Sequence, residues 1–254
     1  MKLPRMAWRG LLLVLHILLG IVLTPLFSRH DPVSGRRRTN PQVVSWWHSV
    51  VVRILHLEVR TTGPLPSPPA LIVSNHVSWL DIIVLGSQTT TAFLSKDEVR
   101  RWPVIGWLAE TAGTLFIQRG RGDAKGIGAA IAGQLQTDRL LALFPEGTTT
   151  DGSDVRPFFS RLFSASIDSG TPVVPVALRY EVDGQRDTVV PYIDDQTLLD
   201  NLRGLLQRKR SQVTVSLGPA IQPADLSRKQ LADQARAFVR EQLAAGNAGP
   251  TTTG

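Results

Sequence analysis

The sequence has no cysteine among its 254 residues and contains only two tyrosines. Without thiols the chain can form no disulfide, no cysteine nucleophile and no thiolate metal site. A serine nucleophile is equally unsupported, because no Gly-x-Ser-x-Gly segment occurs. The four other histidines, at positions 16, 30, 48 and 56, are not spaced from carboxylates as metal ligands would be. The glycines Gly126 and Gly128 lack the third glycine of a dinucleotide-binding turn. We therefore expect no cofactor, no metal and no covalent enzyme intermediate.

Negative charge is also scarce, since 28 basic residues outnumber 21 acidic ones and the formal net charge is +7. Such an excess favours an acidic partner, either a nucleic acid or an anionic membrane. Zinc-finger spacing is absent and few tyrosines could stack on bases, so we expect no nucleic acid partner. Hydrophobic residues make up 43% of a chain that is long enough to bury a full core.

One long apolar stretch is present, Leu11–Phe27, with basic residues before it and Arg29 after it. Residues 24–28 lack the small-residue pattern of a signal-peptide cleavage site. The stretch is slightly short for a helix that spans a bilayer, and an interfacial helix with basic ends fits as well. The sequence therefore predicts a helical membrane anchor and leaves its depth open.

A second helix is expected over residues 43–57, where apolar side chains recur at helical spacing. Its tryptophans, Trp46 and Trp47, suit either a membrane interface or packing on the domain. The proline-rich segment Gly63–Pro69 then ends regular structure. We therefore divide the chain into a membrane-anchoring helical region (1–62), a main domain (63–245) and a disordered tail (246–254).

Short apolar runs alternate with helical patterns through the main domain, which predicts an α/β fold with a mixed sheet covered by helices. The predicted strands are 70–74, 91–95, 114–117, 140–144, 173–178 and 213–217. The predicted helices are 79–85, 104–111, 123–136, 159–168, 196–207 and 223–245.

The segment Asn75–Asp81 places a histidine and a carboxylate five residues apart, directly after an apolar run. If a helix begins near Ser78, Asp81 reaches back to one imidazole nitrogen of His76 and leaves the other free to take a proton. A hydroxyl nucleophile needs such a base, because an alcohol reacts slowly at neutral pH. The spacing alone is a weak signal, and a buried structural histidine is its ordinary alternative.

A second polar segment, Phe144–Asp151, follows another apolar run. Gly147 permits a close backbone approach, and Thr148 and Thr149 offer hydroxyls and amides to an anionic oxygen. An ordinary turn is the alternative. Glu146 would repel a phosphate, so we expect it to order the loop or to bind an acceptor hydroxyl.

Two cations follow predicted strands near the same expected sheet edge, Lys96 and Arg119. An arginine can grip two phosphate oxygens at once, which makes Arg119 the better phosphate ligand of the two. A solvated surface charge is the usual alternative for either residue.

Taken in order, four segments resemble the glycerolipid acyltransferase family, whose bacterial members include 1-acyl-glycerol-3-phosphate acyltransferases. They are Asn75–Asp81, Gly113–Arg119, Phe144–Thr149 and Val173–Ala177. The resemblance implies that His76 is the general base and Asp81 its partner. It also implies that Arg119, with Glu146, Gly147, Thr148 and Thr149, binds the glycerol phosphate of the acceptor. Lys96 remains a substrate-binding candidate by its position after a predicted strand.

The resemblance implies a membrane-associated O-acyltransferase on the cytoplasmic side of a bacterial inner membrane. The acyl group of acyl-CoA or acyl carrier protein would pass to a lysolipid, 1-acyl-sn-glycerol-3-phosphate, to give phosphatidic acid. One departure matters, because many members carry arginine where this chain has Thr149. A branch that acylates lyso-ornithine lipid, whose head group is not phosphate, suits that change. A non-catalytic protein that binds anionic lipid is the alternative of another class.

Overall fold

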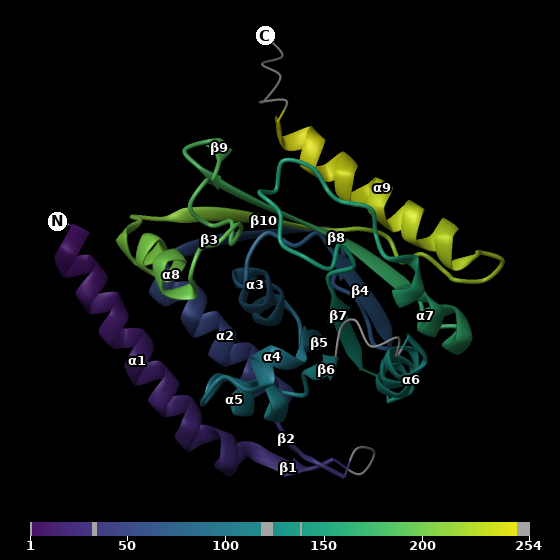
Figure 1. Ribbon diagram of the computed structural model, residues 1–254, viewed down its shortest axis with the longest axis horizontal. Coiled ribbons are helices and arrows are strands. Elements are labelled where there is room, and N and C mark those ends of the chain that lie inside the picture. The colour runs from purple at the N-terminus through teal and green to yellow at the C-terminus, as the bar shows by residue number, and fades with distance from the viewer. Residues whose placement is uncertain (1, 32–34, 118–123, 138, 248–254) are drawn as a thin grey trace.

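The computed structural model describes residues 2–31, 35–117, 124–137 and 139–247. Within these residues one eight-stranded sheet carries helices on both faces, which confirms the predicted α/β fold (Figure 1). The strand order is β3-β10-β8-β4-β7-β5-β6, with β9 paired to β8. The strands of this sheet are β3 (Leu57–Thr62), β4 (Ala70–Ser74), β5 (Thr91–Lys96), β6 (Leu115–Ile117), β7 (Leu140–Leu143), β8 (Val173–Val182), β9 (Gln185–Arg186) and β10 (Ser211–Leu217).

The sheet is mixed, as predicted. β4 is parallel to both of its neighbours, β7 and β8, and β5 is parallel to β7 and β6. β10 runs antiparallel to β8 and parallel to β3. Every residue of β4 is buried, as expected of a central parallel strand. Because β4, β7 and β5 point the same way, their carboxyl ends meet at one edge of the sheet.

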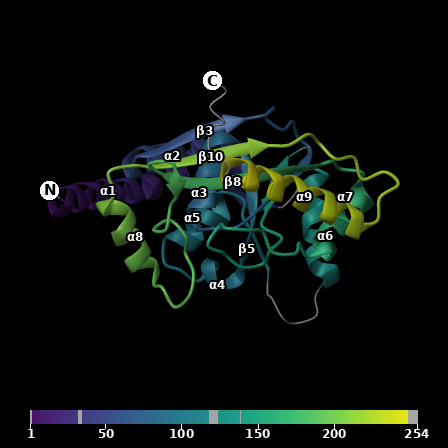
Figure 2. The ribbon, with the colours of Figure 1, turned by 90° about the horizontal axis from the view of Figure 1, so that it is seen from above.

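The helices form two layers around the sheet. The helices are α2 (Pro41–Leu55), α3 (Leu80–Gln88), α4 (Asp97–Arg100), α5 (Ile105–Thr111), α6 (Ala124–Leu135), α7 (Ser164–Ser169), α8 (Leu198–Gln207) and α9 (Arg228–Asn247), with a short 3-10 helix at Ser160–Phe163. Neighbouring residues of β4 serve opposite layers: Ile72 packs with α2, α3 and α8, whereas Leu71 and Val73 pack with α6 and α9. Figure 2 shows α8 toward one end of the molecule and α6, α7 and α9 toward the other.

The largest difference from the predicted elements lies between residues 55 and 62. The helix predicted to reach residue 57 ends at Leu55, because His56 adopts a left-handed conformation with φ 54°. Leu57–Thr62 then forms β3, which pairs with β10 at the edge of the sheet. The predicted boundary after residue 62 therefore falls between two strands of one sheet. The C-terminal helix runs to Asn247, and residues 248–254 of the predicted tail lie outside the described part.

The segment between the first two helices contains a short hairpin. β1 (Ser28–His30) pairs with β2 (Arg37–Thr39). The side chain of Asn40 then accepts the amide of Gln42 and caps α2, whose first residue is Pro41. This hairpin connects the N-terminal helix to the domain.

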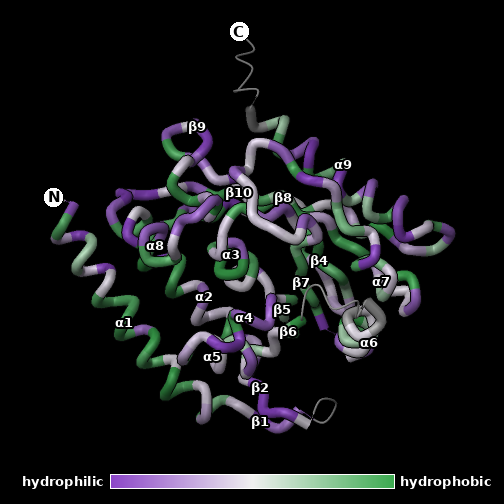
Figure 3. The backbone as a smooth tube through the Cα atoms, viewed as in Figure 1, coloured by the Kyte–Doolittle hydropathy of each residue, from purple (hydrophilic) through white to green (hydrophobic). Residues whose placement is uncertain are grey.

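The N-terminal helix α1 (Lys2–Phe27) lies along the domain (Figure 3), and its polar residues Arg9, His16 and Thr24 are buried. Arg9 donates to the carbonyl oxygens of Arg208 and Lys209 at 2.6 and 3.1 Å, at the C-terminal end of α8. His16 Nε2 lies 3.0 Å from the carbonyl oxygen of Trp47 on α2. The outward face is apolar: its exposed large side chains include Leu11, Val14, Leu15, Leu18, Val22 and Leu26.

Among the described residues, α1 is the one helix long and apolar enough to cross a membrane, with a mean hydropathy of 2.5. Only 17% of the most apolar 18-residue stretch of α1 is buried inside the protein. A helix whose apolar side chains face outward and whose polar ones face the protein needs an apolar environment on its outer side.

Candidate active site

The predicted histidine and aspartate meet at the carboxyl end of β4. His76 Nδ1 lies 2.8 Å from Asp81 Oδ2. This oxygen also accepts the amides of Val77 and Ser78, at 2.7 and 2.9 Å. Since three groups converge on one oxygen that acts as acceptor, Nδ1 carries the hydrogen of the imidazole. The other ring nitrogen, Nε2, is thereby left as a proton acceptor.

The imidazole is held but not sealed from solvent. The His76 side chain is 20% exposed, whereas Asp81 is completely buried. The ring stacks on Phe144, with centroids 4.1 Å apart and planes inclined by 12°. Phe144 directly follows β7, the strand beside β4. The second polar segment, Phe144–Asp151, therefore fixes the plane of the imidazole.

A tyrosine completes the environment of Asp81. Tyr180 on β8 donates its hydroxyl to Asp81 Oδ1 at 2.8 Å. Burial, followed by the charge and the hydrogen bond of Asp81, raises the pKa of Tyr180 well above 10. Tyr180 therefore remains a neutral donor at physiological pH. With it, Asp81 has four hydrogen-bond donors, none of which carries a permanent charge.

Glu146 joins the two sequence motifs through backbone amides. Its Oε1 accepts the amide of His76 and its Oε2 accepts the amide of Arg156, both at 2.7 Å. Burial raises the pKa of the Glu146 carboxyl, while these two amides act in the opposite direction. Of the two roles considered for Glu146, loop ordering is the one these contacts serve. A second connection comes from Asn75, whose amide pairs with both backbone groups of Leu178 at 2.8 and 2.9 Å.

The loop after Glu146 lies against the histidine segment. The Thr150 amide donates to the carbonyl oxygen of His76 at 2.8 Å. Gly147 has a φ of +74°, and a Cβ there would lie 2.5 Å from the ring of Phe159, so a side chain is excluded for two reasons. Thr149 donates its hydroxyl to the carbonyl oxygen of Tyr192 at 2.5 Å. Thr148 is exposed beside it.

Cations line the rim of this edge. Lys96 is exposed at the end of β5, two strands from His76. Arg161 lies over the ring of Phe159 at 5.3 Å, and Phe159 packs on Gly147. Arg156 is exposed on the segment that donates to Glu146. Arg119, the predicted phosphate ligand, lies outside the described residues, so its place in the site stays a prediction.

Tyr180 and Asn75 were not predicted to have these roles, although both lie in or near segments that were singled out. Asn75 begins the first motif, and Tyr180 lies three residues after the fourth, Val173–Ala177. A tyrosine two or three residues beyond a buried strand run gives no local sign of its partner. The pairing with Asp81 depends on β8 lying beside β4.

Comparisons with known proteins identify relatives of this chain. A family model described as Acyltransferase matches residues 56–179, a range that includes both motifs. A lyso-ornithine lipid O-acyltransferase of Pseudomonas aeruginosa is 42% identical over 98% of this chain and 97% of its own length. A 1-acyl-sn-glycerol-3-phosphate acyltransferase of Neisseria meningitidis is 34% identical over 65% of this chain and 66% of its own length.

The fold also has a counterpart among solved structures. The crystal structure of the 1-acyl-sn-glycerophosphate acyltransferase PlsC from Thermotoga maritima superposes with a TM-score of 0.72. The match covers 97% of this chain and 96% of that one at 19% identity, so it supports the fold alone.

Proposed function

This chain belongs to the acyltransferase family, as its two motifs predicted, and we propose that it transfers a fatty acyl group from an acyl thioester to the hydroxyl of a lysolipid, with His76 as the general base. The observation that carries the proposal is the imidazole of His76, bound through Nδ1 to a buried carboxylate and open at Nε2.

The reaction follows from that arrangement. Nε2 of His76 takes the proton of the acceptor hydroxyl while the hydroxyl oxygen attacks the thioester carbonyl carbon. A C–O bond forms, the C–S bond breaks, and the departing thiolate takes the proton back from the imidazolium. Asp81 stabilises the imidazolium charge, since its own donors are all neutral. No acyl-enzyme is required, because the hydroxyl attacks the donor directly.

The oxyanion of the tetrahedral intermediate needs hydrogen-bond donors close to His76. The amides of His76, Val77 and Ser78 are already used by the carboxylates of Glu146 and Asp81. In the described part of the neighbouring loop, the amides of Thr148 and Thr149 have no acceptor. We assign the oxyanion to these two amides.

The acceptor we favour is lyso-ornithine lipid. This choice is supported by the lyso-ornithine lipid O-acyltransferase of Pseudomonas aeruginosa, which matches this chain over nearly its full length. Thr149 agrees with this choice, because its hydroxyl is bound to a backbone carbonyl and contributes no positive charge. The second candidate is 1-acyl-sn-glycerol-3-phosphate, favoured by the Neisseria meningitidis relative and by three exposed cations at the rim, Lys96, Arg156 and Arg161.

In this proposal α1 lies in the membrane interface rather than across the bilayer. The side chains of Arg9 and His16 are bonded to backbone groups of the domain, and a spanning helix would have to leave them. The outward leucines and valines then contact acyl chains of one leaflet. The lysolipid reaches His76 from that leaflet, and the site faces the cytoplasm, where it meets acyl-CoA or acyl carrier protein.

The test is a donor-by-acceptor panel on the purified protein in detergent. Acyl-CoA and acyl carrier protein are each combined with lyso-ornithine lipid, lysophosphatidate and glycerol-3-phosphate, and product is measured by mass spectrometry. Transfer to lyso-ornithine lipid should exceed transfer to lysophosphatidate. A reversed preference would move the assignment to the second acceptor, and transfer to neither would refute the activity.

His76→Ala should reduce transfer by roughly 10²- to 10⁴-fold, the range for a lost general base. The matched control is His56→Asn, which alters an exposed histidine and keeps a residue type that tolerates a left-handed backbone. Turnover by His76→Ala at the level of this control would remove His76 from the mechanism.

A further inference from the structure

A cavity lies at the opposite end of the strands from His76, and nothing in the proposed reaction uses it. Its volume is about 500 Å³, a size typical of small-molecule sites. Thr91 and Leu140, the first residues of β5 and β7, form part of its lining. His76 and Glu146, by contrast, follow the last residues of β4 and β7. The cavity and the candidate active site are therefore separated by the length of the sheet.

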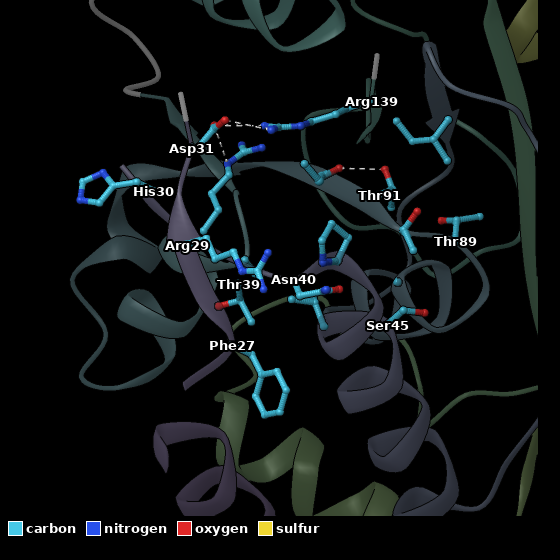
Figure 4. Close-up of a pocket in the computed structure, with 18 of the residues that line it drawn as sticks. Phe27, Arg29, His30, Asp31, Thr39, Asn40, Ser45, Thr89, Thr91 and Arg139 are labelled. Atoms are coloured by element: carbon cyan, nitrogen blue, oxygen red, sulfur yellow. Dashed lines mark hydrogen bonds and ion pairs between the residues drawn. The ribbon is translucent and has the colours of Figure 1, made fainter. Parts of the chain in front are cut away.

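Positive charge exceeds negative charge in this cavity. The lining contains Arg29, Arg38 and Arg139 against a single acid, Asp31, which leaves an excess of two positive charges. Asp31 is buried and paired with two of the arginines: Arg139 donates to both of its oxygens at 3.0 and 3.2 Å, and Arg38 Nε lies 3.6 Å away. Figure 4 shows this cluster at one wall of the cavity.

Arg29 is the cation left to bind a ligand. Its backbone belongs to the β1–β2 hairpin, but among the described residues its side chain makes no hydrogen bond or ion pair, and the residue is exposed at the cavity. Figure 4 shows its side chain reaching toward Asn40, whereas the neighbouring His30 points away. An unpaired guanidinium offers a fork of donors that matches two oxygens of a phosphate.

The polar floor of the cavity also suits an anion. Asn40, Pro41 and Ser45 belong to the start of α2, whose first turn contains no acidic residue, so the positive end of the helix dipole is not neutralised there. Thr90 adds an exposed hydroxyl to the lining, whereas Thr89 and Thr91 donate theirs to the carbonyl oxygens of Leu85 and Ala92. These features support the arginine cluster; they would not define a site without it.

The remaining wall is apolar and continuous with the outward face of α1. Leu26 and Phe27, at the end of α1, line the cavity and are 71% and 47% exposed. With the outward face of α1 in a leaflet, the end of that helix and the adjoining basic hairpin lie at the depth of lipid head groups. A ligand here would meet cations at one end and apolar side chains at the other.

We propose that this cavity binds an anionic phospholipid of the surrounding leaflet, with the phosphate at Arg29 and the start of α2 and the acyl chains along Leu26 and Phe27. The site is distinct from the lysolipid site at His76. It is not used for chemistry, and it selects anionic over zwitterionic membranes for attachment and for the orientation of α1.

The test measures binding of a soluble short-chain lipid, dihexanoyl phosphatidylglycerol, to the full-length protein in detergent by titration calorimetry. Arg29→Gln should weaken binding roughly tenfold, as expected for the loss of a charge-assisted hydrogen bond. Thr90→Trp, at an exposed lining position, should weaken it to a similar degree by filling the cavity without changing the charge. Both variants should melt at the wild-type temperature, because both positions are exposed.

The matched control is Arg36→Gln, which removes the same charge from the same hairpin but outside the cavity lining. It should bind as the wild type does, and so should His76→Ala, which separates this site from the proposed active site. Dihexanoyl phosphatidylcholine and inorganic phosphate should bind at least several-fold more weakly than phosphatidylglycerol. The proposal is overturned if Arg36→Gln weakens binding as much as Arg29→Gln, if His76→Ala abolishes binding, or if inorganic phosphate binds as tightly as the lipid.

Discussion

Asp81 and Asp31 are both buried carboxylates near opposite ends of the parallel strands, and their partners differ in charge. Asp81 is held by one imidazole, two backbone amides and one tyrosine hydroxyl. Asp31 is held by the guanidinium groups of Arg38 and Arg139. Asp81 therefore has only neutral hydrogen-bond donors. Asp31, by contrast, is bound by two permanently charged arginines.

This difference decides what each end can do. Because the partners of Asp81 are neutral, the group beside it that gains most from becoming positive is the imidazole of His76, and this happens when a hydroxyl proton is removed. The charge of Asp31 is already compensated, so it cannot favour a new positive charge nearby. What remains at that end is an excess of positive charge, which attracts an anion.

Asp81→Asn is the strongest test of this difference between the two carboxylates. The asparagine keeps the shape and most hydrogen bonds but removes the charge that stabilises the imidazolium, so turnover should fall by roughly 10²- to 10⁴-fold. Turnover is measured at saturating donor, with Asp233→Asn, an exposed change on α9, as the control. An Asp81→Asn enzyme with more than a tenth of the control turnover would show that the charge is not needed.

His48 is a buried ionisable group that, unlike His76, has no ion pair with a carboxylate in the part of the chain that the structure describes. Burial lowers the pKa of His48 from 6.5 to about 4. Between these pH values the unfolded chain binds more protons than the folded one, so stability is lost as the pH falls from 6.5 toward 4. The contribution reaches about 3 kcal/mol.

His48→Leu should therefore flatten the acidic side of the stability profile, whatever it does to stability at neutral pH. Urea unfolding of the wild type, His48→Leu and the exposed-site control His56→Asn is followed across this pH range. An unchanged slope in His48→Leu would mean that the group is already charged in the folded protein.

Tyr180→Phe tests how the neutral donors of Asp81 affect its charge, because it removes one of them. The less dispersed carboxylate charge should favour the imidazolium, which moves the acidic limb of the pH–rate profile to higher pH. Turnover at neutral pH should fall roughly fivefold, since one buried hydrogen bond is worth about 1 kcal/mol. The control is Tyr192→Phe, whose hydroxyl has no partner among the described residues. A loss of turnover with an unshifted profile would leave Tyr180 a structural role alone.

The smallest expected effect is at the other end of the strands. Asp31→Asn raises the positive excess of the cavity by one charge and should tighten binding of dihexanoyl phosphatidylglycerol a few-fold, while lowering the melting temperature. Calorimetry and thermal unfolding are compared with those of Asp233→Asn. Weaker lipid binding by correctly folded Asp31→Asn would mean that the arginines are aligned for lipid only by their pairing with this carboxylate.

The strands that the sequence predicts well are those whose signal is local. Ala70–Val73 is apolar throughout because both faces of β4 are covered, and the strand Ala70–Ser74 was predicted to the residue. Leu57–Thr62 was missed because an edge strand buries little, and its alternation of Leu57, Glu58, Val59 and Arg60 was assigned in part to the preceding helix. Glu146 was recognised as important, but its two amide partners could not be identified from its neighbours in the chain.

The sequence by itself predicted the contact between His76 and Asp81, because both residues belong to one turn and their contact needs only local folding. It also predicted an apolar N-terminal helix, which the structure shows as α1. The tertiary structure alone decided that Tyr180 bonds to Asp81 across 99 residues and that Arg139 bonds to Asp31 across 108. Such contacts follow from the order of strands in the sheet, and no short segment contains that order.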